Sequence, residues 1–238
     1  MSEQHRAWLA LVDQEGPFLA IPPLKRVWPQ GMPVLPDAAR TRLVDAKPAF
    51  EKAWDTWDRD HEADEALPAY RTARDTWVDV VVRDVLGWGE LLVTDEAATV
   101  KSSARATSPD RTVAVEPTGA LVRGDSCGAL LWVVDPVAGL RDLLDDGWAA
   151  SPIDRMEAML RAGGVPIGVV TDGRWWGLVC ARPKAMVASG IVDAQTWVEE
   201  AQARDAFAAL LHARQLVGGR AEDRLAQLFA ESVAAAEE

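Results

Sequence analysis

The stretch from Ser151 to Ala181, SPIDRMEAMLRAGGVPIGVVTDGRWWGLVCA, constrains the fold of this chain more than any other. Ser151 suits the N-cap of a helix, and Pro152 suits its first position. Apolar residues then recur at helical spacing as far as Gly163-Gly164, where glycine tolerates the left-handed conformation that ends many helices. The first half of this stretch therefore predicts one amphipathic helix.

The second half predicts a β-hairpin. Residues 165–170 form a short apolar run, and residues 174–179 form a second run that contains two tryptophans. Asp172-Gly173 lies between them and is a frequent two-residue hairpin turn of type I′, in which both central residues have positive φ. We expect the two runs to pair as antiparallel strands.

Four further short segments upstream are typical of strands, because Gly, Pro, Ser and Asp separate them. They are residues 91–93, 112–115, 120–122 and 129–134. The last is continuously apolar, which indicates a central strand that is buried on both faces. With helices on either side in the sequence, these strands predict an α+β (α/β) fold with N-terminal helices, a central mixed β-sheet and C-terminal helices.

Helical spacing dominates the N-terminal part of the chain. A first apolar stripe consists of Phe50, Trp54 and Trp57. A second helix starts near Pro68, ends at Gly87 and has a wide apolar face, made of Tyr70, Trp77, Val78, Val81, Val82, Val85 and Leu86. We interpret both stripes as core packing, and we expect the charged segment 58–65 between them to be exposed.

The N-terminal 36 residues are harder to assign. Residues 5–13 predict a short helix. Residues 16–36 contain six prolines among apolar residues, and proline cannot donate a backbone hydrogen bond. We therefore expect an extended segment that wraps around the surface.

At the C-terminal end, Asp193 is expected to cap a long helix that Gly218-Gly219 ends, and a last helix follows from Ala221. The pattern divides the chain into three segments. They are an N-terminal extended and helical segment (1–90), a mixed-sheet core (91–192) and C-terminal helices (193–238).

The net charge of −12 disfavours tight binding to nucleic acid, which depends largely on Lys and Arg contacts to phosphates. The N-terminus lacks the basic region of a signal peptide, and no apolar run approaches the roughly 20 residues that span a bilayer. The two cysteines, Cys127 and Cys180, have no metal or redox spacing. These features favour a cytoplasmic protein with no membrane partner.

Three carboxylates on the strand segments are the one candidate for catalytic chemistry, because the P-loop, zinc-protease and serine-hydrolase motifs are missing. Glu116, Asp125 and Asp135 could converge at strand ends and hold Mg²⁺, as in metal-dependent nucleases. The alternative is that they are turn residues, since each adjoins Pro or Gly. We favour the turn interpretation and assign no catalytic residue and no metal.

A second candidate site lies at and beyond the hairpin. Arg174, Trp175 and Trp176 could stack on bases or on a protein partner, and Arg182 and Lys184 add positive charge nearby. Tryptophans in such a position are more often core or strand-pairing residues. We therefore treat all five as candidates for contact with DNA or a partner.

Three pieces of the chain resemble the N-terminal region of large adenine-specific DNA methyltransferases of phage defence. These include type IIG restriction–modification enzymes and the methyltransferase of the DISARM system. The pieces are HRAWLALVDQEGPFLAIPPLKRVWPQG (5–31), WAASPIDRMEAMLRAGGVPIGVVTDGRWWGLV (148–179) and LFAESVAAAEE (228–238). GVVTDGRWWGLV resembles the (L/V)TNGxxW hairpin of restriction-type N-terminal domains.

The resemblance implies a PD-(D/E)xK nuclease-like fold in a degenerate form. Such nucleases have an acid on one strand and an acid-x-Lys on the next, whereas the best-matching positions here are Pro117-Thr118 and Val133-Val134-Asp135. The chain also has no asparagine, and its single Asp-Pro does not continue as the N/D-P-P-Y/F/W motif of adenine methyltransferases. Methyl transfer from S-adenosylmethionine is therefore expected to belong to a parent protein beyond Glu238, with no cofactor in this chain.

Three functions remain open. The favoured one is a non-catalytic N-terminal module of such a methyltransferase, which provides scaffolding, contacts other defence-system proteins or supports weak DNA binding. The second is a metal-dependent DNA nuclease with a displaced acidic site. The third is a free-standing defence or regulatory protein of similar fold.

Overall fold

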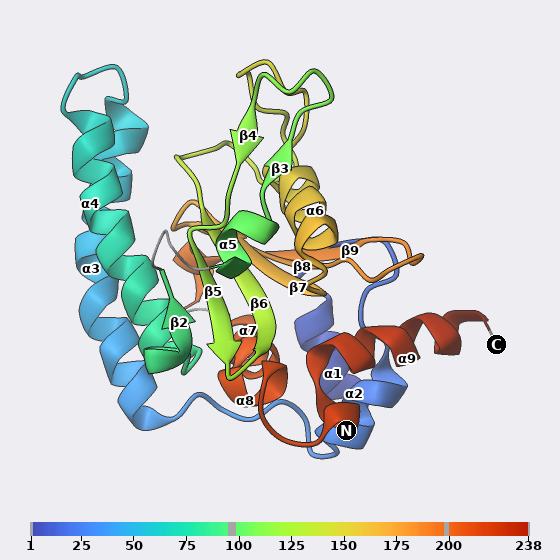
Figure 1. Cartoon of the computed structure of the whole chain (residues 1–238). Coiled ribbons are helices and arrows are strands. Elements are labelled where there is room, and N and C mark those ends of the chain that lie inside the picture. Colours follow the sequence, from blue (N-terminus) through green and yellow to red (C-terminus); the bar gives the residue numbers. More distant parts are fainter. Residues whose placement is uncertain (1, 95–98, 198–199, 238) are drawn as a thin grey trace.

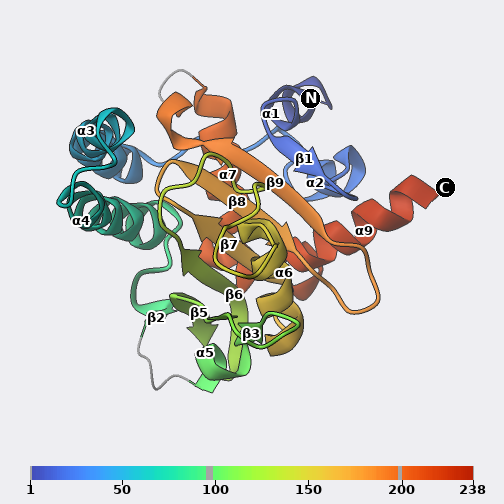
Figure 2. The same ribbon diagram turned by 90° about the horizontal axis from the view of Figure 1, so that it is seen from above.

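A seven-stranded mixed sheet runs through the molecule in the order β1-β9-β8-β7-β6-β5-β2 (Figures 1 and 2). The computed structural model describes residues 2–94, 99–197 and 200–237. The strands of the sheet are β1 (Asp13–Glu15), β2 (Leu92–Val93), β5 (Gly119–Arg123), β6 (Ser126–Val133), β7 (Ile167–Thr171), β8 (Trp175–Cys180) and β9 (Ala188–Asp193). Only β6 and β7 are parallel among these neighbours, and β3 (Ala106–Thr107) and β4 (Ala114–Val115) form a separate pair.

Helices cover both faces of the sheet. The α-helices are α1 (Ser2–Leu9), α2 (Ile21–Val27), α3 (Asp37–Arg59), α4 (Ala66–Asp79), α5 (Thr99–Ser103), α6 (Pro152–Gly163), α7 (Ala201–Leu211), α8 (Ala213–Leu216) and α9 (Leu225–Glu237). A π-helix, η1 (Val80–Val85), continues α4, and short 3₁₀ turns are η2 (Gly89–Leu91), η3 (Ala194–Thr196) and η4 (Ala221–Asp223). The fold is therefore α+β with a mixed sheet, as the sequence predicts, and no helix of the described ranges is long and apolar enough to cross a membrane.

Two apolar cores lie on opposite faces of the sheet, because side chains alternate along each strand. Leu130, Val170 and Val179 face the core beneath α6. Leu131, Val169 and Leu178 face the larger core, which the N-terminal and C-terminal helices share. The predicted central strand is confirmed, since Ala129, Leu130 and Leu131 are buried between β5 and β7.

The predicted helix and hairpin of the organising stretch are confirmed. Ser151 and Asp154 form a reciprocal capping box at the start of α6, and Gly164 ends the helix with φ of 64°. Strands β7 and β8 then pair antiparallel.

The type I′ turn is wrong. The last strand pair is Thr171 with Trp176, so four residues form the loop, and within it only Gly173 has positive φ. The carboxylate of Asp172 accepts hydrogen bonds from the backbone N–H groups of Arg174 and Trp175. These bonds build an Asx turn in place of the two-residue turn.

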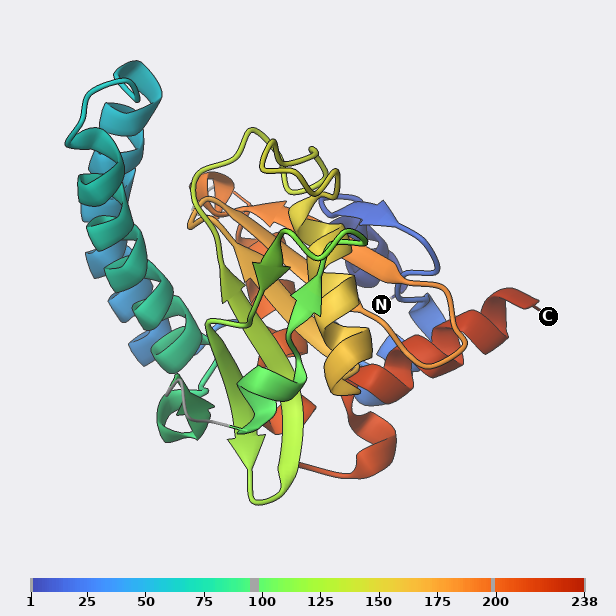
Figure 3. The same cartoon turned by 45° about the horizontal axis from the view of Figure 1, so that its top comes forward.

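The two predicted tryptophan-rich stripes pack as expected. In the first stripe, Phe50 and Trp54 of α3 are buried and Trp57 is half-buried. The second stripe extends along α4 and η1 to Leu86, and all seven of its residues are buried. Helices α3 and α4 form an antiparallel hairpin along one side of the sheet, with the exposed segment 58–65 at its tip (Figures 1 and 3).

The prediction of an extended segment over 16–36 is wrong for its middle part, which forms α2. Pro22 and Pro23 lie in the first turn of this helix, where backbone N–H groups have no helical acceptor, so proline loses no hydrogen bond there. The first helix also ends earlier than predicted, at Leu9, and Asp13 begins an edge strand, β1, that pairs with β9.

The predicted long C-terminal helix is divided. Asp193 caps only the short η3, and α7 starts at Ala201, while residues 198–199 lie outside the described part of the chain. The chain then leaves the helical conformation at His212, whose ring Nδ1 accepts a hydrogen bond from the N–H of Arg214 at the start of α8. This break between α7 and α8 forms one wall of a cleft.

Candidate functional site

The three candidate acids lie apart from one another. Glu116 follows β4 and pairs with Arg105 at 3.2 Å. Asp125 lies in the turn before β6, and Asp135 lies after the end of that strand. Because β6 has eight residues and a strand rises roughly 3.3 Å per residue, these two carboxylates are on the order of 25 Å apart. Within the described residues, no group of three His, Cys, Asp or Glu side chains could hold a metal ion.

The two positions at which the family resemblance expects nuclease acids are neighbours, because Thr118 directly precedes β5 and Val133 ends the adjacent strand β6. The N–H of Val133 donates a 2.8 Å hydrogen bond to the Thr118 hydroxyl, and the Thr118 N–H donates to the carbonyl of Leu131. A hydroxyl and an isopropyl group thus occupy the two positions, and neither supplies a carboxylate for a divalent cation.

At the position where the resemblance expects a lysine, the chain has an acid, Asp135, which two arginines hold. Arg71 donates two hydrogen bonds to its carboxylate, at 2.7 and 2.5 Å, and Arg74 approaches at 3.4 Å. The bonds from Arg71 hold the pKa of Asp135 below its usual range. Arg74 also donates to the carbonyl of Val134 and pairs with Asp75. Both guanidinium groups are therefore engaged within the chain.

Asp172 lies at the end of the neighbouring parallel strand, β7, and is fully buried. Its carboxylate accepts three backbone N–H groups, from Val137, Arg174 and Trp175, at 3.2, 3.0 and 2.8 Å. Burial raises the pKa of Asp172 to about 6, although the three donors oppose this shift. The Tyr70 hydroxyl donates to the carbonyl of the same residue at 2.6 Å. These contacts connect the hairpin to α4 and to the segment after β6.

The hairpin candidates for DNA or partner contact are built into the fold. The Arg174 guanidinium lies over the rings of Trp54 and Trp175, at 5.0 and 4.5 Å from their centroids, and pairs with Asp193 at 3.0 Å. Trp175 is half-buried, whereas Trp176 is completely buried and donates its indole N–H to the carbonyl of Gly173. This geometry leaves Arg174 little freedom to contact another molecule.

Arg182 and Lys184 lie in the loop between β8 and β9, at the opposite end of β8 from Arg174. The length of β8, six residues, separates them from Arg174 by roughly 20 Å. Lys184 is exposed and has φ of 58°. The five candidates therefore form two separate groups rather than one continuous strip.

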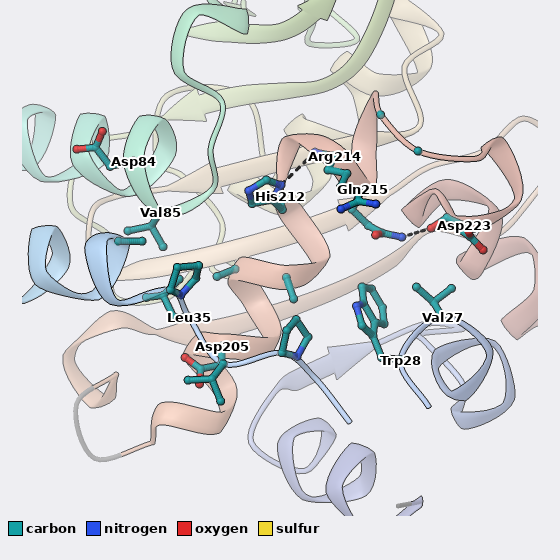
Figure 4. Close-up of a pocket in the computed structure, with 18 of the residues that line it drawn as sticks. Val27, Trp28, Leu35, Asp84, Val85, Asp205, His212, Arg214, Gln215 and Asp223 are labelled. Carbon is teal, nitrogen blue, oxygen red and sulfur yellow. Dashed lines mark hydrogen bonds between the residues drawn. The ribbon is translucent and has the colours of Figure 1, made fainter. Parts of the chain in front are cut away.

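A cleft of about 890 Å³ is a further site, one that sequence analysis does not indicate (Figure 4). Its walls come from the segment after α2, the start of α3, η1, and the α7–α8 region. The lining residues named in Figure 4 are Val27, Trp28, Leu35, Asp84, Val85, Asp205, His212, Arg214, Gln215 and Asp223. The volume lies in the range of roughly 300–1,000 Å³ that is typical of small-molecule sites.

His212 is the titratable group at the helix break in this cleft. Its Nδ1 accepts from the N–H of Arg214 at 3.1 Å, so in the neutral ring the proton resides on Nε2. Burial, with a smaller contribution from Arg214, lowers the pKa of His212. The ring also lies against Gly87, where an added Cβ would come within 2.7 Å of Nε2. Gly87 is therefore required for close packing as well as for its positive φ of 65°.

Comparisons of the chain with protein-family models, with curated proteins and with solved structures give no match.

Proposed function

We propose that this chain is a non-catalytic N-terminal module of a DNA adenine methyltransferase in a phage-defence or restriction–modification system. It contacts partner proteins of that system and supports DNA binding. The observation that carries the non-catalytic part is the hydrogen bond between Thr118 and Val133. This bond makes neighbours of the two positions at which the resemblance expects acids, and neither residue has a carboxylate to bind Mg²⁺.

The surroundings of Asp135 give further support. In the expected acid-x-Lys pattern this position is a lysine, whereas here it is a carboxylate that Arg71 and Arg74 hold. Metal-dependent cleavage would need carboxylates gathered around one ion, and Asp125 lies at the other end of β6. In the proposed parent protein, S-adenosylmethionine would bind outside these 238 residues.

We expect the isolated chain neither to cut nor to methylate DNA. The measurements are nicking of supercoiled plasmid with Mg²⁺ or Mn²⁺ and transfer of a labelled methyl group from S-adenosylmethionine. Nicking that depends on the metal and disappears in Asp135→Ala would instead establish the nuclease alternative. Methyl transfer by the purified chain would contradict the proposal directly.

We expect the chain to bind duplex DNA weakly, with a Kd of about 10⁻⁴–10⁻⁶ M that rises as salt is added. The charge of −12 and the engagement of Arg71, Arg74 and Arg174 in ion pairs leave few cations for phosphates. Fluorescence anisotropy with a labelled duplex across a salt series measures both the affinity and its slope.

The β8–β9 loop provides the sharper part of this test. The double variant Arg182→Ala/Lys184→Ala should weaken binding and reduce the logarithmic salt slope by up to about 2, at roughly 0.9 per phosphate contact. The control, Lys52→Ala/Arg123→Ala, makes the same charge change at exposed positions on α3 and β5. An equal loss of DNA affinity in the two double variants would mean that net charge alone governs binding. Nanomolar, salt-resistant binding by the chain would contradict the supporting role.

A further inference from the structure

The cleft between the segment after α2 and the α7–α8 region has mainly apolar walls. In Figure 4, Leu35 and Val85 lie on one side of the space and Trp28 lies across from them. Small side chains of α3 and α7 complete the lining. Val34 at its edge is 69% exposed. An apolar ligand body would remove this surface from water, at roughly 25 cal/mol per Å².

The acids of the cleft already have cationic partners. Asp84 pairs with Arg42 at 2.9 Å, Asp205 pairs with Arg204 at 2.7 Å, and Asp223 pairs with Arg26 at 2.6 Å. Asp223 also pairs with Arg220. A cationic ligand would have to compete with these arginines for the three carboxylates. The acids of the cleft therefore do not favour the binding of a cation.

Three donors of the cleft are in the opposite situation, whereas Arg220 and Gln215 are bonded to Asp223. Within the described part of the chain, the guanidinium of Arg214, the Nε2 of His212 and the indole N–H of Trp28 have no hydrogen bond or ion pair. Among the described residues, the His212 ring is hydrogen-bonded through Nδ1 alone, which leaves Nε2 as a donor. The cleft thus offers apolar walls and unpaired donors, and an anion or a strong acceptor complements both.

We propose that this cleft binds a small organic anion, whose apolar body packs against Trp28, Leu35 and Val85 and whose anionic group meets Arg214 and His212. This site is distinct from the ends of β6 and β7 and from the β8–β9 loop, so it does not depend on the DNA-supporting role. A carboxylate or a phosphate would satisfy the same donors.

The test compares three ten-carbon probes that differ only in the head group, namely decanoate, decanol and decylamine. Titration of the full chain is followed by calorimetry and by the indole N–H resonances of ¹⁵N-labelled protein, with Trp28→Phe identifying the Trp28 signal. We expect decanoate to bind with at least about tenfold higher affinity than decanol, and decylamine to bind weakest, because a charged hydrogen bond contributes more than a neutral one.

Two variants and a control locate the binding. Arg214→Gln should weaken decanoate binding about tenfold and leave decanol unchanged, as expected for the loss of one charge-assisted contact. Ala38→Trp adds bulk at an exposed position of the wall and should weaken all probes. Arg123→Gln makes the same charge change at the end of β5, outside the cleft, and should have no effect.

Several results would overturn the proposal. Decylamine binding as tightly as decanoate would mean that the acids dominate the cleft. Decanoate binding that neither Arg214→Gln nor Ala38→Trp weakens would be non-specific surface binding. The absence of any decanoate-dependent shift of Trp28 up to millimolar concentration would exclude the site.

Discussion

Replacing Trp77 with alanine is expected to lower the free energy of unfolding by about 3–5 kcal/mol, the usual range for removing a buried tryptophan. Trp77 is 1% exposed and stacks on Phe50, with ring centroids 5.4 Å apart and nearly parallel planes. It also contacts Trp197, and its indole N–H donates to the carbonyl of Gly173 at 2.9 Å. One side chain of α4 therefore joins α3, the residue after η3 and the hairpin loop.

Urea unfolding followed by circular dichroism measures this loss. Trp77→Phe should retain much of the packing and lose only the indole bond, so we expect a cost nearer 1–2 kcal/mol, on the order of a buried polar bond with some change in volume. The matched control is Trp57→Ala, on the same helical hairpin but half-buried at its tip. A loss for Trp57→Ala as large as that for Trp77→Ala would contradict the assignment of Trp77 to a shared core.

The hairpin could be predicted because its signals are local. The helix cap, the glycine stop and the two apolar runs lie within about 30 consecutive residues and agree with one another. The turn type could not be predicted in the same way. Asp172 accepts hydrogen bonds from the N–H of Val137 and the hydroxyl of Tyr70, which are distant in sequence. The loop geometry therefore depends on tertiary contacts that local residue preferences do not predict.

The two errors at the ends of the chain also have physical causes. Proline is unfavourable in the interior of a helix but favourable in its first turn. The six prolines of residues 16–36 therefore do not exclude a helix, because Pro22 and Pro23 lie at the start of one. The break at His212 follows no glycine or proline. It arises where the ring accepts the N–H of Arg214 and where the N–H of Ala213 bonds to the carbonyl of Leu86.

The separation of the candidate acids was open in the sequence because it depends on which end of each strand a residue occupies. Once β6 is defined, Asp125 and Asp135 must lie at opposite ends of it. The cleft is even harder to predict from the sequence, because its walls come from residues near 30, 85 and 210 that share no motif.

Comparison of the wild type with Asp172→Asn across pH 4–7 is expected to reveal an unfavourable contribution of the buried carboxylate. Burial raises its pKa to about 6 in the folded protein, against roughly 3.9 in an unfolded chain. Between those values the folded state keeps a proton that the unfolded state has lost, so the contribution of Asp172 to stability falls as pH rises. Two pKa units correspond to about 3 kcal/mol, which is an upper bound for this change.

Urea unfolding of both proteins at each unit of pH measures the difference, and the titration of other groups largely cancels in it. Relative to the variant, the wild type should lose stability from pH 4 to pH 6 and change little above that. Asp125→Asn, in an exposed turn, is the matched control for the loss of one carboxyl group. The outcome decides between two opposing effects at one residue. If the free energy of unfolding of the wild type instead rises relative to that of the variant as pH rises, the N–H groups of Val137, Arg174 and Trp175 stabilise the carboxylate by more than its burial costs.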